Sequence, residues 1–549
     1  MSAGVPLRSD PQALARATHT RGGAAAIAAR LGRGPEQRSG TPAGTERPVS
    51  QRDEVSSHVI TRPAMAVPAA ADIRIDTRPM RIILLERSVR PLILLGAALL
   101  FWLISSLEVP QGLTPEGLRA IAVFSVCLVL WITSALPLVV TSILAIVLLP
   151  MAGVMPAGKV YALFGNEAVF FILGVFILAA SLMKSRLSTR LALVTLRRFG
   201  NTPLQLLVSI YLLNAFMSFF MSEHAVAAMN FPIIMEIVGV LRLAPRRSNY
   251  GRALFLSMAW GTTIGGVATL LGGARAPLAL GMVREATGET FTFTQWAVAN
   301  LPIVALLLIV GYFVITRFFP IDVASIREAD ELLEQRALAL GRMSVREKSI
   351  ATIMLLTLAG WVIGGEQYGL ASVALAAVVT LFLFGLVRWE DVEEYVNWGI
   401  LLMYGGAIAL GAAVSNSGAA VWISQQTISR WVESAPMVVA VISGISILLT
   451  EAMSNSAVVA LLMPLTLGIA TDYQIAPRVM ALVVSVPAGL GFTLPIGTPA
   501  NAIAYSSGFL SIRDMMVPGA ILSVSSWIVF NLVAWYYWPL LGIHIGPVP

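Results

Sequence analysis

Three ionisable residues, Glu223, His224 and Arg275, lie within stretches of sequence that are otherwise apolar. A carboxylate in such a place can bind a cation, and a guanidinium can bind an anion. A carboxyl group or an imidazole can instead carry a proton, because an apolar environment favours the neutral carboxyl form and histidine titrates near neutral pH. Ionisable groups inside apolar segments are costly, so these three residues are candidate functional residues.

Two later apolar stretches are interrupted by residues with hydroxyl and amide groups. Ser454, Asn455 and Ser456 interrupt the first, and residues 497–501 (GTPAN) interrupt the second. Where a helix begins inside a membrane protein, its free N–H groups and nearby hydroxyls attract an anion, and the free carbonyl oxygens at a helix end attract a cation. These residue types therefore predict an ion-binding site.

No enzyme motif accompanies these residues. The chain has no HExxH sequence, no P-loop and no convincing Ser/His/Asp order. Its lone cysteine, Cys127, excludes disulfides and zinc clusters. We therefore do not expect an enzyme.

The composition excludes a soluble protein. Of the 549 residues, 57% are hydrophobic and 12% are charged, whereas soluble domains carry roughly 25% charged residues. The mean hydropathy is +0.80. The net charge of +7 does not indicate nucleic-acid binding, because the basic residues fall between the hydrophobic runs, where membrane topology accounts for them. The sequence therefore predicts an all-α, polytopic membrane protein.

The ends of the chain and its basic loops predict an orientation. We expect residues 1–85 to form a disordered, Arg-rich tail. They have no apolar periodicity and cannot bury enough surface to offset the entropy of ordering. Basic residues concentrate in loops at 184–198, 242–252 and 317–348. Since cytoplasmic loops carry the excess of Lys and Arg, we expect a cytoplasmic N-terminus and an outside C-terminus, in a cytoplasmic membrane.

We expect the membrane region to consist of two halves, residues 90–320 and 348–543. An amphipathic cytoplasmic helix at 321–347 is expected to join them. Three motif pairs repeat between the halves at shifts of 231, 232 and 224 residues; the first pair is FGNEAVFFILGVFILAA from Phe164 and YVNWGILLMYGGAIALG from Tyr395. Each half contains an odd number of full spans, so the second half enters the membrane inverted. Inverted repeats are typical of secondary transporters, whose site lies at the repeat interface near the midplane.

Each half contains one predicted re-entrant hairpin, at 203–241 and 435–471, with the polar residues at its tip. Two ordinary spans joined by a tight turn are the alternative. Each half also contains a predicted broken helix, at 253–287 and 479–507, because Gly and Pro there remove helical hydrogen bonds. A proline kink without a ligand is the alternative. Backbone at such breaks is tolerated in a membrane only where it faces protein or a water-filled cavity.

Three segments resemble signatures of the divalent anion/sodium symporter family. They are GTPANAIAYSSG at 497–508, TEAMSNSAVVALLMPL at 450–465 and WITSALPLVVTSILAIVLLPMAGV at 131–154. This family comprises the dicarboxylate, citrate and sulfate cotransporters, and the resemblance covers roughly residues 90–540. It implies eleven transmembrane helices, two re-entrant hairpins, a homodimer and elevator-type movement of a transport domain.

The resemblance also implies site residues, and the second half fits the family well. The substrate-binding positions fall on the hairpin tip and the broken helix, at Ser454, Asn455, Ser456, Thr498 and Pro499. The positions that lend oxygens to the second sodium ion are Thr450, Asn455 and Gly497. Glu451 is the acid common before this tip, and we expect it to have a structural role.

The first half departs from the family pattern. Glu223 and His224 replace the family Asn and Thr, and Arg275 stands where the repeated motif has Pro499. The substrate-binding positions implied here are Ser222, His224 and Arg275. The positions implied for sodium or another coupling ion are Ser218, Glu223 and Gly273.

Several interpretations of these departures remain open. Glu223 could strengthen the first sodium site as a carboxylate ligand. Alternatively, Arg275 could replace that sodium ion, either by pairing with Glu223 or by binding substrate. In a third interpretation, Glu223 or His224 carries a proton. The simplest alternative is a permanent ion pair that only joins the hairpin to the broken helix.

We expect a secondary active transporter of small divalent anions, of the C4-dicarboxylate, citrate or sulfate class, coupled to Na⁺ and without an organic cofactor. A proton-coupled symporter or a dicarboxylate exchanger of the same fold is one alternative. An ion channel or an arsenite-type permease is another. The expected partners are the dianion, the lipid bilayer and a second copy of the chain, and no nucleic acid.

Overall fold

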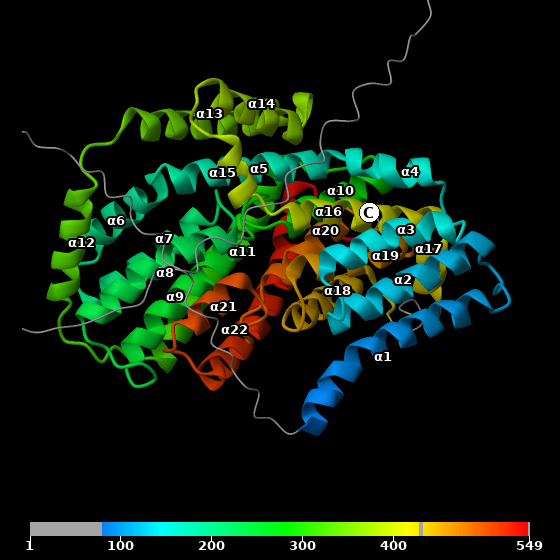
Figure 1. The fold of residues 1–549 in the computed structure, drawn as a ribbon, viewed down its shortest axis with the longest axis horizontal. Helices are drawn as coiled ribbons and strands as arrows, with labels where there is room; N and C mark the ends of the chain where they lie inside the picture. The colour runs from blue at the N-terminus through cyan, green and yellow to red at the C-terminus, as the bar shows by residue number, and fades with distance from the viewer. Residues whose placement is uncertain (1–79, 428–431, 547–549) are drawn as a thin grey trace, which may run out of the picture. The chain divides into compact units, whose positions relative to one another are not determined.

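The computed structural model describes residues 80–427 and 432–546, and every regular element within these ranges is helical (Figure 1). This confirms the predicted all-α class. Almost all of the predicted tail, residues 1–85, lies outside the described residues. Its last residues are helical, because α1 begins at Met80.

The helices fall into two series on either side of a short linking helix. The first series is α1 (Met80–Ser105), α2 (Pro115–Thr133), α3 (Leu138–Met151), α4 (Ala157–Ala162), α5 (Glu167–Lys184), α6 (Leu187–Phe199), α7 (Pro203–Met217), α8 (Glu223–Val240), α9 (Asn249–Gly265), α10 (Arg275–Thr287) and α11 (Phe293–Phe318). The linking helix is α12 (Arg327–Ala339). The second series is α13 (Val345–Tyr368), α14 (Leu370–Leu383), α15 (Trp389–Tyr395), α16 (Trp398–Asn416), α17 (Ala419–Gln426), α18 (Ala435–Thr450), α19 (Asn455–Asp472), α20 (Pro477–Ser485), α21 (Pro499–Ser506) and α22 (Ile512–Leu532).

Many of these helices are suited to a bilayer. Among the described residues, eight helical runs are long and apolar enough to cross a membrane, and shorter apolar helices accompany them. Large apolar side chains on α13 and α14, such as Ile363 and Leu383, are exposed, as expected for helices that face lipid. The chain is therefore a multi-pass membrane protein, while a total of eleven transmembrane helices remains a prediction.

In the first series, the chain is interrupted at both places where the sequence predicts a break. Residues 218–222 separate α7 from α8, and the Ser222 hydroxyl caps α8 by accepting from the Ala225 N–H. Residues 266–274 separate α9 from α10. The two interruptions are bonded to each other, because the Glu223 N–H donates to the Gly272 carbonyl at 3.0 Å.

The second series repeats this arrangement. Residues 451–454 separate α18 from α19, and the Ser454 hydroxyl accepts from the Ala457 N–H. A short 3₁₀ turn at Pro487–Gly489 and an irregular stretch to Thr498 separate α20 from α21. These breaks also lie at the predicted positions. Whether each hairpin returns to the membrane face from which it entered stays a prediction.

The linking helix is shorter than the predicted segment at 321–347. α12 buries Ala329 and Leu333. Its charged face forms exposed ion pairs, Arg197 with Glu334 at 2.7 Å and Arg336 with Glu236 at 2.5 Å. α12 thus joins the ends of α6 and α8.

Glycines allow α7 and α9 to pack closely. A side chain at Gly261 would collide with the backbone of Tyr211, and one at Gly265 would collide with the backbone of Ala215. The spacing of these two glycines therefore serves helix packing, as small residues do at membrane helix interfaces. This close contact fixes α9, which leads directly into the first broken loop.

We predict that Gly265→Val destabilises the protein by about 1–3 kcal/mol, since extra volume in a tightly packed contact forces the helices apart. Thermal unfolding of the detergent-purified protein measures the effect. Gly239→Ala is the matched control, because it lies on α8 with no atom within 4 Å of its added Cβ. Equal melting temperatures for both variants would contradict the packing role.

Candidate functional site

One cavity of about 720 Å³ collects the interruptions of both series. Eleven of the thirteen predicted site residues line it: Ser222, Glu223, His224, Gly273, Arg275, Ser454, Asn455, Ser456, Gly497, Thr498 and Pro499. The other two, Ser218 and Thr450, are buried behind the tips. The structure therefore brings residues more than two hundred positions apart into one candidate site, which we call the candidate substrate cavity.

Four helices begin at this cavity. α8, α19 and α21 start directly after the capping residues Ser222, Ser454 and Thr498, and α10 starts at Arg275. A helix start presents free N–H groups and a partial positive charge. Each capping hydroxyl accepts from its own helix. The hydrogens of the Ser222 and Ser454 hydroxyls are thereby left free to donate to a ligand, whereas the Thr498 hydroxyl also lies 3.4 Å from the Thr263 hydroxyl. The arrangement suits an anion.

The second-series tip also forms a cluster of oxygen atoms. The end of the Asn455 side chain lies 3.0 Å from the Gly497 carbonyl oxygen, 3.3 Å from the Ala488 carbonyl oxygen and 2.8 Å from the Thr450 hydroxyl. With its nitrogen inward, the amide donates to these oxygens. With its oxygen inward, it completes a set of four oxygens, the kind of donor set that unwound helices offer to sodium. The residues present therefore fit a cation.

Glu451 has the structural role that the sequence predicts. Its carboxylate accepts from the backbone N–H groups of Phe492, Thr493 and Leu494 at 2.9–3.1 Å and from the Ser523 hydroxyl at 3.1 Å. These bonds fix the irregular stretch before α21. The carboxylate is thus fully occupied by protein donors.

Asn501, part of the second-half motif, also holds the loop together rather than lining the cavity. Its amide nitrogen donates to the carbonyl oxygens of Gly491 at 3.1 Å and Leu494 at 3.3 Å. It therefore positions the loop whose Gly497 carbonyl faces the oxygen cluster.

The first-series tip differs in chemistry. A nitrogen (Nη1) of Arg275 donates to a carboxylate oxygen (Oε1) of Glu223 at 2.6 Å, and both side chains are at most 5% exposed. The Ser218 hydroxyl and the second terminal nitrogen (Nη2) of Arg275 are buried without a hydrogen-bond partner in the described structure. His224, by contrast, is exposed to the cavity.

Sequence reasoning missed three residues of the cavity lining. Glu394 and Tyr395, at the end of α15, and Asn397, which precedes α16, line the cavity. One signal was present: Asn397 repeats Asn166 at the shift of 231, and each caps the helix that follows it. Residues that contribute only a backbone carbonyl to the site, such as Ala488, cannot be recognised in the sequence, because the side-chain type does not reveal where the carbonyl points.

Asp391 anchors α15, which carries part of this lining, to α5. Its carboxylate pairs with Lys184 and accepts from the Arg388 N–H at 3.0 Å. Burial by itself raises the pKa of the Asp391 carboxyl, but the bonds from Lys184 and Arg388 outweigh it, so the pKa lies below its usual value. The carboxylate therefore stays charged, and α15 stays attached to α5, at neutral pH.

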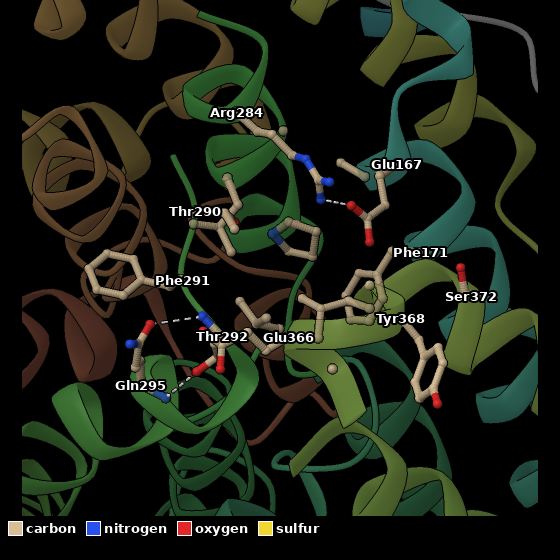
Figure 2. Close-up of a pocket in the computed structure, with 18 of the residues that line it drawn as sticks. Glu167, Phe171, Arg284, Thr290, Phe291, Thr292, Gln295, Glu366, Tyr368 and Ser372 are labelled. Carbon is tan, nitrogen blue, oxygen red and sulfur yellow. Dashed lines mark hydrogen bonds and ion pairs between the residues drawn. The ribbon is translucent and has the colours of Figure 1, made fainter. Parts of the chain in front are cut away.

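A second cavity of about 540 Å³ lies at the other end of α5 (Figure 2). None of the predicted site residues lines it. Arg284 of α10 forms an ion pair with Glu167 at the start of α5. Glu167 also accepts from the Ala371 N–H of α14 at 3.2 Å. The second cavity is thus bordered by a contact that ties α10 to α5 and α14.

We predict that Glu451→Gln destabilises the protein by about 1.5–3 kcal/mol, the scale of hydrogen bonds to a charged group. The amide keeps one acceptor but presents its N–H₂ group to backbone donors. Thermal unfolding in detergent tests this, with the exposed Glu289→Gln as control. An unchanged melting temperature would show that Glu451 does not hold the loop.

Comparison with known proteins agrees with this architecture. Residues 87–544 match the family described as the sodium:sulfate symporter transmembrane region. The sodium-dependent dicarboxylate transporter SdcS of Staphylococcus saprophyticus is 29% identical over 482 residues, which cover 82% of this chain and 92% of the relative. The transporter of the same name from Staphylococcus aureus strain NCTC 8325 is 29% identical over 468 residues, covering 80% and 90%.

A solved structure is also similar, at a lower level. The YdaH transporter of Alcanivorax borkumensis shares 16% identity with a TM-score of 0.47, over 71% of this chain and 89% of that one. This likeness is too low to support a conclusion. The family match, which spans most of the chain, confirms the family that the motifs predict and a transporter rather than an enzyme. The chain belongs to the sodium:sulfate symporter family, a family of membrane transporters.

Proposed function

We propose that the protein is a secondary active transporter that moves small divalent anions together with Na⁺. One observation carries the proposal: four helix starts and a cluster of oxygens open onto a single cavity. The helix starts offer N–H groups and hydroxyls to a dianion. The oxygen cluster offers a place for the cation that offsets part of its charge.

The substrate is bound, in this proposal, by the hydroxyls of the two tips and of α21. Ser222, Ser454, Ser456 and Thr498 stand around the cavity, and His224 and Pro499 are exposed to it. A dianion loses its hydration in such a site, so directed donors have to replace the lost water. The names of both SdcS relatives, sodium-dependent dicarboxylate transporters, favour a dicarboxylate over citrate or sulfate.

The coupling ion binds, in this proposal, among Thr450, Asn455, Gly497 and Ala488. No carboxylate belongs to this cluster, so its affinity for Na⁺ rises when the dianion is next to it. This mutual stabilisation couples the two ligands, since each increases the affinity for the other by the same factor. A homodimer in the cytoplasmic membrane, with the N-terminus inside and the C-terminus outside, is part of the same proposal.

Uptake of labelled succinate, citrate and sulfate into proteoliposomes tests the proposal. We expect an inward Na⁺ gradient to concentrate at least one of these anions at fixed pH. Uptake that Na⁺ does not affect would contradict sodium coupling. Uptake that no ion gradient can concentrate would indicate a channel.

Asn455→Ala tests the oxygen cluster. We expect the affinity for Na⁺ to fall about tenfold or more, the result of losing about 1.5 kcal/mol or more of ion contact. Asn416→Ala is the control, because Asn416 is exposed at the end of α16. If uptake by Asn455→Ala depends on Na⁺ in the same way as wild-type uptake does, the oxygen cluster is not the sodium site.

Proton coupling is the second candidate, and one observation favours a particular residue for it. Glu223 is held by Arg275, whereas His224 is exposed to the cavity and can exchange protons with it. We expect His224→Gln to leave the pH profile of uptake unchanged if Na⁺ is the coupling ion. A loss of pH dependence in that variant would favour the proton.

We also propose that the two cavities belong to alternate states of an elevator-type movement. They lie at opposite ends of α5, and the repeated residues Asn397 and Asn166 line one each. Asn166 donates to the Gly281 carbonyl at 3.4 Å and to Glu285 at 3.3 Å. Together with the Glu167–Arg284 pair, these bonds close the end of α5 that the second cavity borders.

Glu167→Gln weakens that closure in this proposal. In this proposal, the bonds that close the opposite end of α5 stabilise the state in which the candidate substrate cavity is exposed. We expect Glu167→Gln to destabilise that state, so that the cavity is exposed less often. The measurement is the rate at which Ala228→Cys, in the cavity lining, reacts with a thiol reagent; the native Cys127 is buried and gives little background. An unchanged rate, equal to that with the control Glu289→Gln, would contradict the closure.

A further inference from the structure

The two hairpin tips are equivalent by the internal repeat, yet they hold different chemistry. At the shift of 232, Thr450 corresponds to Ser218 and Asn455 corresponds to Glu223. At the shift of 224, Gly497 corresponds to Gly273 and Pro499 to Arg275. The second tip therefore presents neutral oxygens around a point that a cation can fill. The first tip presents a carboxylate with a guanidinium already against it.

The guanidinium lies beside counterparts of the residues that would hold that cation. Arg275 bonds to Glu223, the counterpart of Asn455, at 2.6 Å. A side chain at Gly273, the counterpart of Gly497, would collide with the same guanidinium. Two of the counterparts of the oxygen cluster, Glu223 and Gly273, thus lie against the guanidinium.

Glycines make room for the ion pair on both sides. A side chain at Gly266 would collide with the Glu223 carboxylate, and one at Gly489 would collide with the Arg275 guanidinium. Gly489 belongs to the second series and follows Ala488, whose carbonyl contributes to the oxygen cluster. The space for the pair is therefore provided by both halves of the molecule.

The pair is not simply a stabilising contact. A buried ion pair contributes little net stability compared with apolar residues of the same volume, because both charges lose their hydration. Arg275 also lines the cavity, and its buried Nη2 nitrogen has no hydrogen-bond partner in the described structure. The pair therefore leaves one guanidinium nitrogen available for a further bond.

We propose that Arg275 is a resident cation that takes the place of a coupling ion in the first half, so that transport depends on a single Na⁺ site, in the second half. Glu223 holds the guanidinium in position. The Nη2 nitrogen donates to the dianion. This inference rests on the proposed function, which supplies the second-half sodium site.

The test compares the sodium dependence of uptake in variants that keep the site neutral. Removing one partner of the pair leaves an uncompensated buried charge, which is strongly destabilising. Glu223→Asn with Arg275→Pro instead gives the first half the residues of the second half. Position 275 is the first residue of α10, where a proline fits a helix. Ala274 would have to change from helical to extended backbone, the conformation that Thr498 has before Pro499. Glu223→Gln with Arg275→Met removes both charges and keeps the volume.

We expect a Hill coefficient for Na⁺ of about one in the wild type and approaching two in E223N/R275P, since this coefficient is limited by the number of sites. E223Q/R275M is expected to bind the dianion at least about tenfold more weakly, because a charged donor is lost. Arg275→Lys keeps a cation there and is expected to keep the wild-type Hill coefficient. The same sodium dependence is measured independently by Na⁺-induced thermal stabilisation of the purified proteins, which does not require transport.

Two results would overturn the inference. One is a wild-type Hill coefficient near two, with a matching ratio of ²²Na⁺ to substrate. The other is a purified, folded E223Q/R275M protein with wild-type affinity for both ligands. These results differ from failure of the proposed function, which would appear as wild-type uptake that is indifferent to Na⁺.

Discussion

Backbone groups left unpaired inside an apolar environment impose the constraint on which this structure depends. Each of the four interrupted helices frees N–H and carbonyl groups that hydrocarbon cannot satisfy. The fold meets this demand by bonding each hairpin tip to the broken loop of its own series. In the first series Glu223 bonds to Gly272. In the second series Glu451 bonds to residues 492–494. The groups that remain free face a shared cavity, and they can be satisfied by ions.

Much of this architecture could be predicted from the sequence, because its causes are local. Gly, Pro and polar residues inside apolar runs locate the breaks, and the similar shifts between motifs, 231, 232 and 224 residues, indicate which breaks correspond. Contributions that depend on tertiary geometry could not be predicted. The Ala488 carbonyl joins the oxygen cluster only because Pro487–Gly489 forms a 3₁₀ turn. Whether Arg275 pairs with Glu223 remained open until the positions of the two side chains were known.

In the proposed mechanism, the two tips also meet the same electrostatic problem in two different ways. A neutral tip leaves the compensating charge to a mobile ion, whose availability the cell controls. A tip that contains a guanidinium carries the compensating positive charge permanently. The glycines at positions 266 and 489 provide the space that the second solution needs, so the substitution at position 275 depends on small residues elsewhere in the chain.

The neutral Glu223–Arg275 pair has an electrical consequence. A dianion that crosses with one sodium ion carries one net negative charge, to which the pair adds nothing. With a membrane voltage of about 100 mV, negative inside, inward movement of that charge costs about 2.3 kcal/mol. A second sodium ion would remove this cost. A carrier of this design therefore favours export or one-for-one exchange whenever the sodium gradient is shallow, and its direction depends on voltage.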